Sequence, residues 1–68
     1  MKYAVLFEKT ATGFSAHVPD LPGCVAAGAT LAEPTNLIAG AIKLHLAGLR
    51  EDGEPVPEPH TIAEYIAA

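Results

Sequence analysis

This sequence has few of the residues that stabilise small proteins through covalent bonds or metals. Among its 68 residues there is one cysteine, Cys24, and no tryptophan. A single cysteine excludes an intrachain disulfide, and no Cys/His cluster has the spacing of structural zinc ligands. Basic residues are also scarce, with four Lys and Arg against eight Asp and Glu and a formal net charge of −4. This balance argues against direct binding of nucleic acid, which needs cations to face the phosphates.

Long apolar runs are absent too. No stretch approaches the ~18 residues that cross a membrane, and no charged segment followed by an apolar one marks a secretion signal. We therefore expect a cytoplasmic protein, with residues 1–68 forming a single domain. Half of the residues are hydrophobic, but only two Phe and two Tyr supply aromatic rings. The core is therefore small, and help from oligomerisation or from a partner is expected.

Alternating apolar residues predict a β-hairpin near the N-terminus. Residues 2–8 and residues 14–18 alternate as strands do, and the connection between them ends at Gly13, which tolerates positive φ. Residues 19–23 (PDLPG) form a loop that two prolines make rigid. Residues 24–27 can then form a third short strand.

A helix is predicted from about residue 31 to residue 50. Thr30 and Glu33 have the spacing of a capping box, although Pro34 would also suit a helix that starts there. The positions that repeat every three or four residues and face the core are Leu31, Ile38, Ala41, Ile42, His45 and Leu49. Three leucines are expected off this stripe, where they would form an oligomer interface: Leu37, Leu44 and Leu46.

After the helix the composition changes. Residues 51–54 (EDGE) predict a helix end, and residues 55–59 (PVPEP) predict an extended, polyproline-like segment. Thr61 and Glu64 repeat the capping-box spacing, which predicts a short final helix over residues 61–66. The predicted fold class is α+β, with a small antiparallel sheet in the order β-β-β-α, then the proline-rich segment and the short helix.

No set of residues predicts an active site. His17, His45 and His60 lack metal-ligand spacing, and no carboxylate stands at a fixed offset to orient any of them. Cys24 has no nearby cation to favour a thiolate, so it is better interpreted as a small buried residue. We find no rigid carboxylate pair, phosphate-binding glycine loop or nucleophile elbow. The sequence therefore predicts a binding module without cofactor or metal, and not an enzyme.

Four segments of the chain carry a family resemblance. They are residues 1–9 (MKYAVLFEK), 18–24 (VPDLPGC), 28–31 (GATL) and 48–59 (GLREDGEPVPEP). Together they resemble the HicB family, the small antitoxins of type II toxin–antitoxin systems. The most specific part is the combination of P-D-L-P-G-C with E-D-G-E-P-x-P-x-P further along the chain.

The resemblance implies a partly degraded RNase H-like fold without the nuclease carboxylates. It also implies a partner, a HicA toxin, which is a small basic mRNA-cleaving protein whose catalytic surface the antitoxin covers. Many family members carry a C-terminal DNA-binding domain and a fourth strand after the short helix. Neither is expected within residues 1–68, so we expect no operator binding by this chain alone.

Two main functions are compatible with these features. The first is neutralisation of a HicA-type toxin, and the alternative is a stand-alone oligomeric binding or structural module without a toxin partner; a relict nuclease is least favoured. Every charged residue in 51–68 is acidic, which suits a basic partner. The residues expected to bind the partner are Asp20, Leu21, Pro22, Gly23, Glu51, Asp52 and Glu54.

Overall fold

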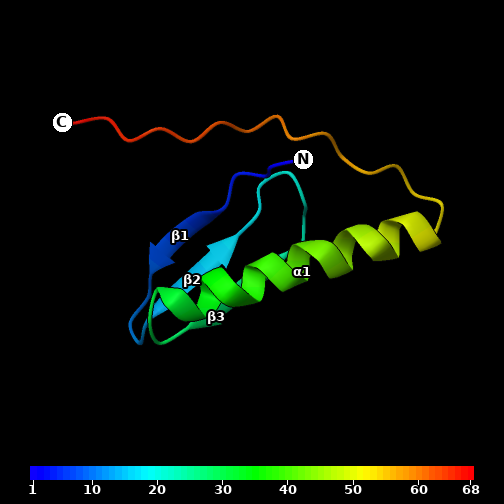
Figure 1. The fold of residues 1–68 in the computed structure, drawn as a ribbon. Coiled ribbons are helices and arrows are strands. Elements are labelled where there is room, and N and C mark those ends of the chain that lie inside the picture. Colours follow the sequence, from blue (N-terminus) through cyan, green and yellow to red (C-terminus); the bar gives the residue numbers. More distant parts are fainter.

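The computed structural model describes all 68 residues. It contains three strands, β1 (Leu6–Lys9), β2 (Phe14–His17) and β3 (Val25–Gly28), followed by one helix, α1 (Ala32–Glu51). The strands form one antiparallel sheet in the order β1-β2-β3, and α1 packs against β3 and β2 (Figure 1). The predicted α+β class and the β-β-β-α order are confirmed.

The first strand is shorter than predicted. The ladder between β1 and β2 begins with Leu6 opposite His17, so residues 2–5 lie outside it. Beyond His17 the chain enters the loop of residues 18–24, whose backbone N–H groups bond carbonyls of the same loop. In the register of the ladder, residues 2–5 would face residues 18–21, where the N–H groups of Val18 and Leu21 bond within the loop and Pro19 has none, so the ladder does not extend.

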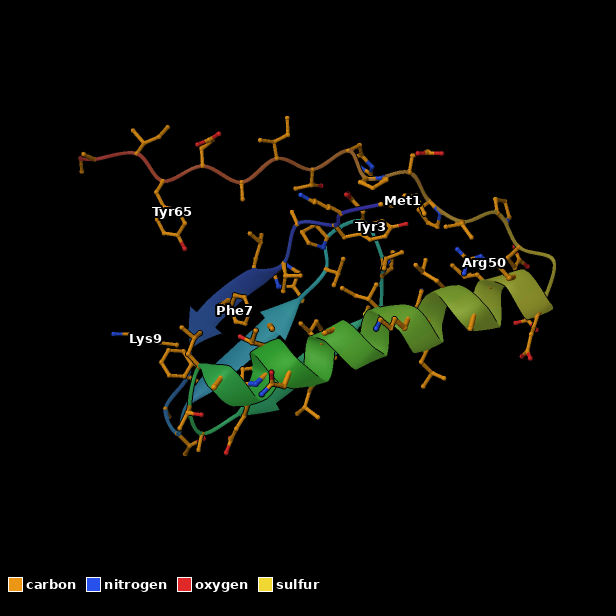
Figure 2. All side chains as sticks on the ribbon, viewed as in Figure 1. Met1, Tyr3, Phe7, Lys9, Arg50 and Tyr65 are labelled. Atoms are coloured by element: carbon orange, nitrogen blue, oxygen red, sulfur yellow. The ribbon has the colours of Figure 1, made fainter.

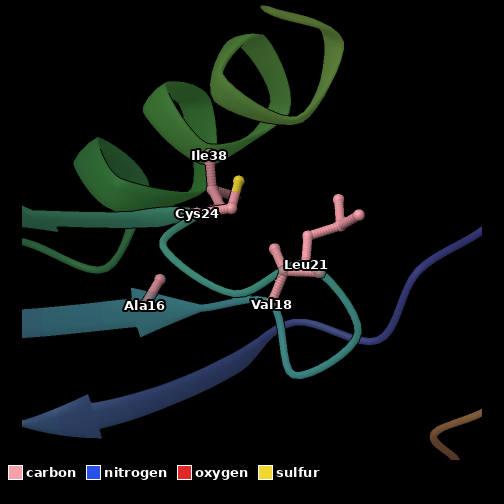
Figure 3. Packing of buried hydrophobic residues seen from close by; sticks show 5 residues of the cluster. All are labelled: Ala16, Val18, Leu21, Cys24 and Ile38. Atoms are coloured by element: carbon pink, nitrogen blue, oxygen red, sulfur yellow. The ribbon is translucent and has the colours of Figure 1, made fainter. Parts of the chain in front are cut away.

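The core lies between α1 and the sheet and extends into the loop of residues 18–24. Its five buried apolar residues are Ala16, Val18, Leu21, Cys24 and Ile38 (Figure 3). The interpretation of Cys24 as a small buried residue is confirmed. Three of the five, Val18, Leu21 and Cys24, come from the loop, so this connection supplies apolar surface as well as a change of direction.

The core-facing side of α1 differs from the predicted stripe at three positions, one of which is Pro34, whose side chain is fully buried. Leu31 is exposed, whereas Leu46 packs against the core. Leu46 follows Ile42 by four residues and therefore stays in the same row of side chains along the helix. The prediction that Leu46 lies off the stripe is thus wrong. Leu37 and Leu44 do lie off it, since 57% and 77% of their surfaces are exposed.

The predicted capping box at the start of α1 forms only in part. The Glu33 side chain reaches back, but its Oε2 accepts a hydrogen bond from the backbone N–H of Ala29, at 2.6 Å, instead of from Thr30. No side chain caps the helix, because the residue at the cap position is Leu31, whose apolar side chain offers no acceptor. The helix therefore starts two residues before Pro34, which lies in the first turn, where a missing N–H costs nothing.

The end of α1 agrees with the prediction. Gly53 follows the helix with φ of 69°, in the left-handed region that favours glycine. The backbone N–H of Glu54 then donates to the carbonyl oxygen of Leu49 at 2.8 Å. This turn reverses the chain, which returns across the N-terminal segment in an extended form (Figure 1).

The predicted final helix is wrong. Residues 54–68 contain neither helix nor strand, and residues 62–68 are exposed. A helix of about six residues is not stable without tertiary support. In addition, Thr61 cannot serve as a free helix cap, because its hydroxyl and its backbone N–H both donate to Asp20.

Candidate functional site

The loop of residues 18–24 is held by its own backbone. The N–H of Val18 donates to the Cys24 carbonyl, that of Leu21 to the Val18 carbonyl, and that of Cys24 to the Leu21 carbonyl, at 3.0 to 3.1 Å. Leu21 has no exposed surface, whereas Pro22 and Gly23 at the tip are exposed. Of the loop residues expected to bind a partner, only Pro22 and Gly23 are therefore accessible.

Asp20 lies inside this loop with only 5% of its surface exposed. Its Oδ2 accepts hydrogen bonds from the backbone N–H groups of His60, at 3.0 Å, and Thr61, at 3.1 Å. Its Oδ1 accepts the Thr61 hydroxyl at 2.5 Å and lies 3.2 Å from Nε2 of the His60 ring. The carboxylate thus joins two segments that are forty residues apart in the sequence, and both of its oxygens are occupied.

These bonds explain the ionisation of Asp20. The hydrogen bond from the Thr61 hydroxyl lowers the pKa of Asp20 below its ordinary value, although burial of the carboxyl acts in the opposite direction. The two backbone N–H groups and the His60 ring lower the pKa further. Asp20 is therefore a carboxylate whose charge stabilises the position of the segment that donates to it.

A second contact holds the same segment. The hydroxyl of Tyr3 donates to the carbonyl oxygen of Pro57 at 2.6 Å. Figure 2 shows Tyr3 beside the returning chain, while Tyr65 further along carries its ring out into solvent. We call residues 54–61 the strap. It is tied to the body of the protein at Pro57 and again at its last two residues.

Sequence reasoning missed the partners of Asp20. The two proline-containing motifs were singled out, but Thr61 was interpreted as the cap of a short helix and His60 as the residue before it. The useful signal was the joint occurrence of the motifs, because Asp20 belongs to the first motif and its donors follow the second directly.

The acidic residues predicted to contact a partner are accessible. Glu51, Asp52 and Glu54 are all exposed at the end of α1 and the start of the strap, and Glu58 is exposed within it. None of these side chains forms a salt bridge, since the chain's single close ion pair joins His60 and Asp20. These carboxylates are therefore exposed to solvent and unpaired within the chain.

The residues that most often hold metals or react as nucleophiles are not assembled into a site. No group of three or more His, Cys, Asp or Glu side chains is placed to hold a metal ion, and the surface has no pocket. Burial raises the pKa of the Cys24 thiol, which favours its unreactive protonated form. The accessible features are instead the acidic surface of the strap and the outer face of α1.

Comparison with known proteins decides the family. The family described as the HicB-like antitoxin of bacterial toxin–antitoxin systems matches residues 3–68. The chain belongs to the HicB-like antitoxin family. The resemblance seen in the sequence motifs is thereby confirmed.

Two relatives and one solved structure are similar to this HicB-like chain. An uncharacterised 14.9 kDa protein of Haemophilus phage HP1, from the rep-hol intergenic region, is 41% identical over 66 residues; these are 97% of the chain and 50% of the phage protein. The UPF0150 protein ssr1765 of Synechocystis sp. is 36% identical over 66 residues, 96% of the chain and 84% of that protein. The chain thus spans half the length of its phage relative.

The fold is similar to that of a chain in the solved HicA3 and HicB3 toxin–antitoxin complex. The TM-score is 0.73 with 33% sequence identity, over 88% of this HicB-like chain and 70% of the other. The strands and the helix described above therefore belong to a fold that is found in a toxin–antitoxin complex. Separately, α1 is not apolar enough along its length to cross a lipid bilayer.

Proposed function

We propose that this protein is an antitoxin that binds and neutralises a small basic toxin of the HicA type. The observation that carries the proposal is the similarity to a chain of the HicA3 and HicB3 complex over 88% of the present chain. The exposed acidic residues support it, because an anionic surface both attracts a cationic protein and competes with RNA for it. An antitoxin of this kind acts in the cytoplasm, where mRNA is translated, and needs no catalytic activity, metal or cofactor.

In this proposal residues 1–68 form one HicB-like domain, the degraded RNase H-like unit that the family resemblance implies. The toxin contact consists of Glu51, Asp52 and Glu54 with the loop tip, Pro22 and Gly23. The sequence also suggested Asp20 and Leu21 for this contact, but both are buried. In this proposal they support the contact indirectly, by fixing the loop from inside. The domain by itself binds no operator DNA, because it carries a net charge of −4.

Co-expression tests the proposal directly. A HicA-type toxin encoded in the same genome is expressed with and without this protein in a bacterial host, and growth is followed. We expect the protein to restore growth and to co-purify with the toxin. Toxicity that persists, together with no complex in size-exclusion chromatography at micromolar concentrations, would contradict the proposal.

Charge reversal tests the proposed contact. Changing Glu51 and Glu54 to Lys together should weaken toxin binding, most strongly at low salt, because Debye screening already hides such charges at high salt. Both side chains are exposed, so circular dichroism should stay unchanged. Unchanged affinity at low salt would show that the toxin does not contact this acidic surface.

The second candidate is a stand-alone oligomeric module, which one observation favours. Leu37 and Leu44 are seven residues apart, on the same exposed side of α1 and away from the sheet. Exposed apolar side chains of this kind mark interaction surfaces. We propose self-association through Leu37 and Leu44, with Leu46 supporting the helix from the core side. A monomeric mass by light scattering at micromolar concentration would contradict it, as would an oligomer that persists in the L37E/L44E double variant.

A further inference from the structure

The strap has no backbone support of its own. Apart from the bonds within helices and strands, the backbone–backbone hydrogen bonds of the chain lie in turns, the loop of residues 18–24 and the ends of α1, and none involves residues 55–68. An extended segment without such bonds keeps one position only if side chains elsewhere hold it. Tyr3 and Asp20 are the residues that do so.

The two contacts differ in strength. The Tyr3 hydroxyl makes one neutral hydrogen bond to the Pro57 carbonyl. Asp20 accepts three hydrogen bonds from two consecutive residues, and bonds to a charged acceptor are the stronger kind. Its carboxylate is almost completely buried, so release of the strap would leave a charged group without the donors that compensate its desolvation. The Asp20 contact is therefore the main anchor.

We propose that Asp20, assisted by Tyr3, is a positioning residue that clamps the strap in one conformation and so presents its acidic side chains as a preformed surface to a cationic partner. That this cationic partner is a HicA-type toxin rests on the proposed toxin-neutralising function. Clamping matters for binding because a segment that is already ordered loses little conformational entropy when a partner docks. Glu54 and Glu58, whose side chains are exposed on the clamped segment, are the charges that benefit directly.

The chemistry of Asp20 suits this role. Its two oxygens accept from the Thr61 hydroxyl on one side and from the His60 and Thr61 N–H groups on the other. An alanine at this position offers no acceptor at all. The loop of residues 18–24, fixed by its own hydrogen bonds and by the buried Leu21, holds the carboxylate at a defined place.

Amide hydrogen exchange on the isolated protein tests the clamp without any partner. Asp20→Ala removes the anchor, and Glu58→Ala is the matched control, because it removes one carboxylate from the exposed side of the strap. In Asp20→Ala we expect the amides of His60 and Thr61 to lose about tenfold or more of their protection, as loss of a charge-assisted hydrogen bond implies. Glu58→Ala should leave them unchanged, and amides of β2 should keep their protection in both variants.

A milder variant covers the case in which Asp20→Ala unfolds the protein. Thr61→Val keeps the shape of the side chain and removes the hydroxyl donor, so it should lower the protection of the same two amides by a smaller factor. Unprotected His60 and Thr61 amides in the unmodified protein would overturn the clamp. So would equal exchange in Thr61→Val, Glu58→Ala and the unmodified protein.

Binding of a HicA-type toxin then tests what the clamp is for. We expect Thr61→Val to bind more weakly through a larger unfavourable entropy in calorimetry, while Tyr65→Phe, on an exposed side chain without partners, binds as the unmodified protein does. If hydrogen exchange changes as expected but the affinity for the toxin does not, the proposal that the clamp presents the strap to a partner is wrong. If the unmodified protein binds no such toxin, the proposed function fails, and the exchange data still decide whether the clamp exists.

Discussion

The loop of residues 18–24 and the strap of residues 54–61 are both proline-containing connections, yet they are held in different ways. The loop closes on itself through three backbone hydrogen bonds and places Leu21 and Cys24 in the core. The strap makes no backbone–backbone bonds beyond its first residue and depends on Tyr3 and Asp20. Proline limits the conformations of both segments, but it does not decide where either of them lies.

This difference shows that the stiffness of a segment does not determine its position in the fold. A stiff segment reaches a unique place only when buried apolar surface or hydrogen bonds from outside hold it there. In the loop the apolar surface of Leu21 does so, whereas in the strap the buried charge of Asp20 does. The two regions should therefore respond differently to mutation and to pH.

Removing the apolar anchor of the loop should have the largest effect. Leu21 is fully buried, so Leu21→Ala should lower the free energy of unfolding by about 2–5 kcal/mol. The corresponding change in the strap, at the half-buried Val56, should cost only about 1 kcal/mol. Urea denaturation measures both, and equal losses would contradict the distinction between the two regions.

Acid should act on the strap before it acts on the loop. The pKa of Asp20 is lowered from its ordinary value of 3.8, so its stabilising contribution is complete above that pH and is lost as the pH falls through the lower folded-state pKa. The titratable group that faces it is the His60 ring. Asp20→Asn should therefore flatten the acid dependence of stability below about pH 4, as thermal unfolding would show. If the acid dependence of stability is the same in Asp20→Asn as in the unmodified protein, other carboxylates control it.

Loss of the second anchor should be milder. Tyr3→Phe removes the hydroxyl that donates to the Pro57 carbonyl, and a neutral hydrogen bond of this kind contributes about 1 kcal/mol. Tyr65→Phe removes a hydroxyl from a fully exposed ring and should leave the stability unchanged. Chemical denaturation of the two variants side by side provides the comparison, and similar values for both would argue that the Tyr3 contact adds nothing.

Proline replacement should have the smallest effect and should not distinguish the two regions. Pro22→Ala in the loop and Pro59→Ala in the strap should each cost about 0.4–1 kcal/mol, because proline acts mainly by restricting the unfolded chain. Denaturation curves should therefore give similar losses for both. A much larger loss at Pro59 would show that the strap relies on proline more than on its side-chain anchors.

The secondary structure was largely predictable, and the exceptions have local reasons. The hairpin, the third strand and the end of α1 follow from short-range patterns and from Gly53. The final helix failed, because its predicted cap, Thr61, bonds Asp20 instead. Leu46 was misplaced, because helical periodicity does not show how wide a face of α1 the sheet and loop cover.

The candidate site was predictable in composition but not in arrangement. The exposure of Glu51, Asp52 and Glu54 agrees with what their sequence context indicated. Asp20 was singled out as a partner contact, yet its carboxylate is occupied by the chain's own strap. No local pattern shows that bond, because its two ends lie forty residues apart in the sequence.

The motifs of the sequence resembled the HicB family. Composition and local spacing by themselves determined the α+β order of elements, the buried character of Cys24 and the acidity of the C-terminal quarter. These properties depend on composition and on the spacing of nearby residues, which local physics controls. Only the tertiary structure decided which side of α1 is covered, which loop residues are buried and where the strap lies. Those outcomes depend on packing and on hydrogen bonds between distant segments, and they exist only once the chain has folded.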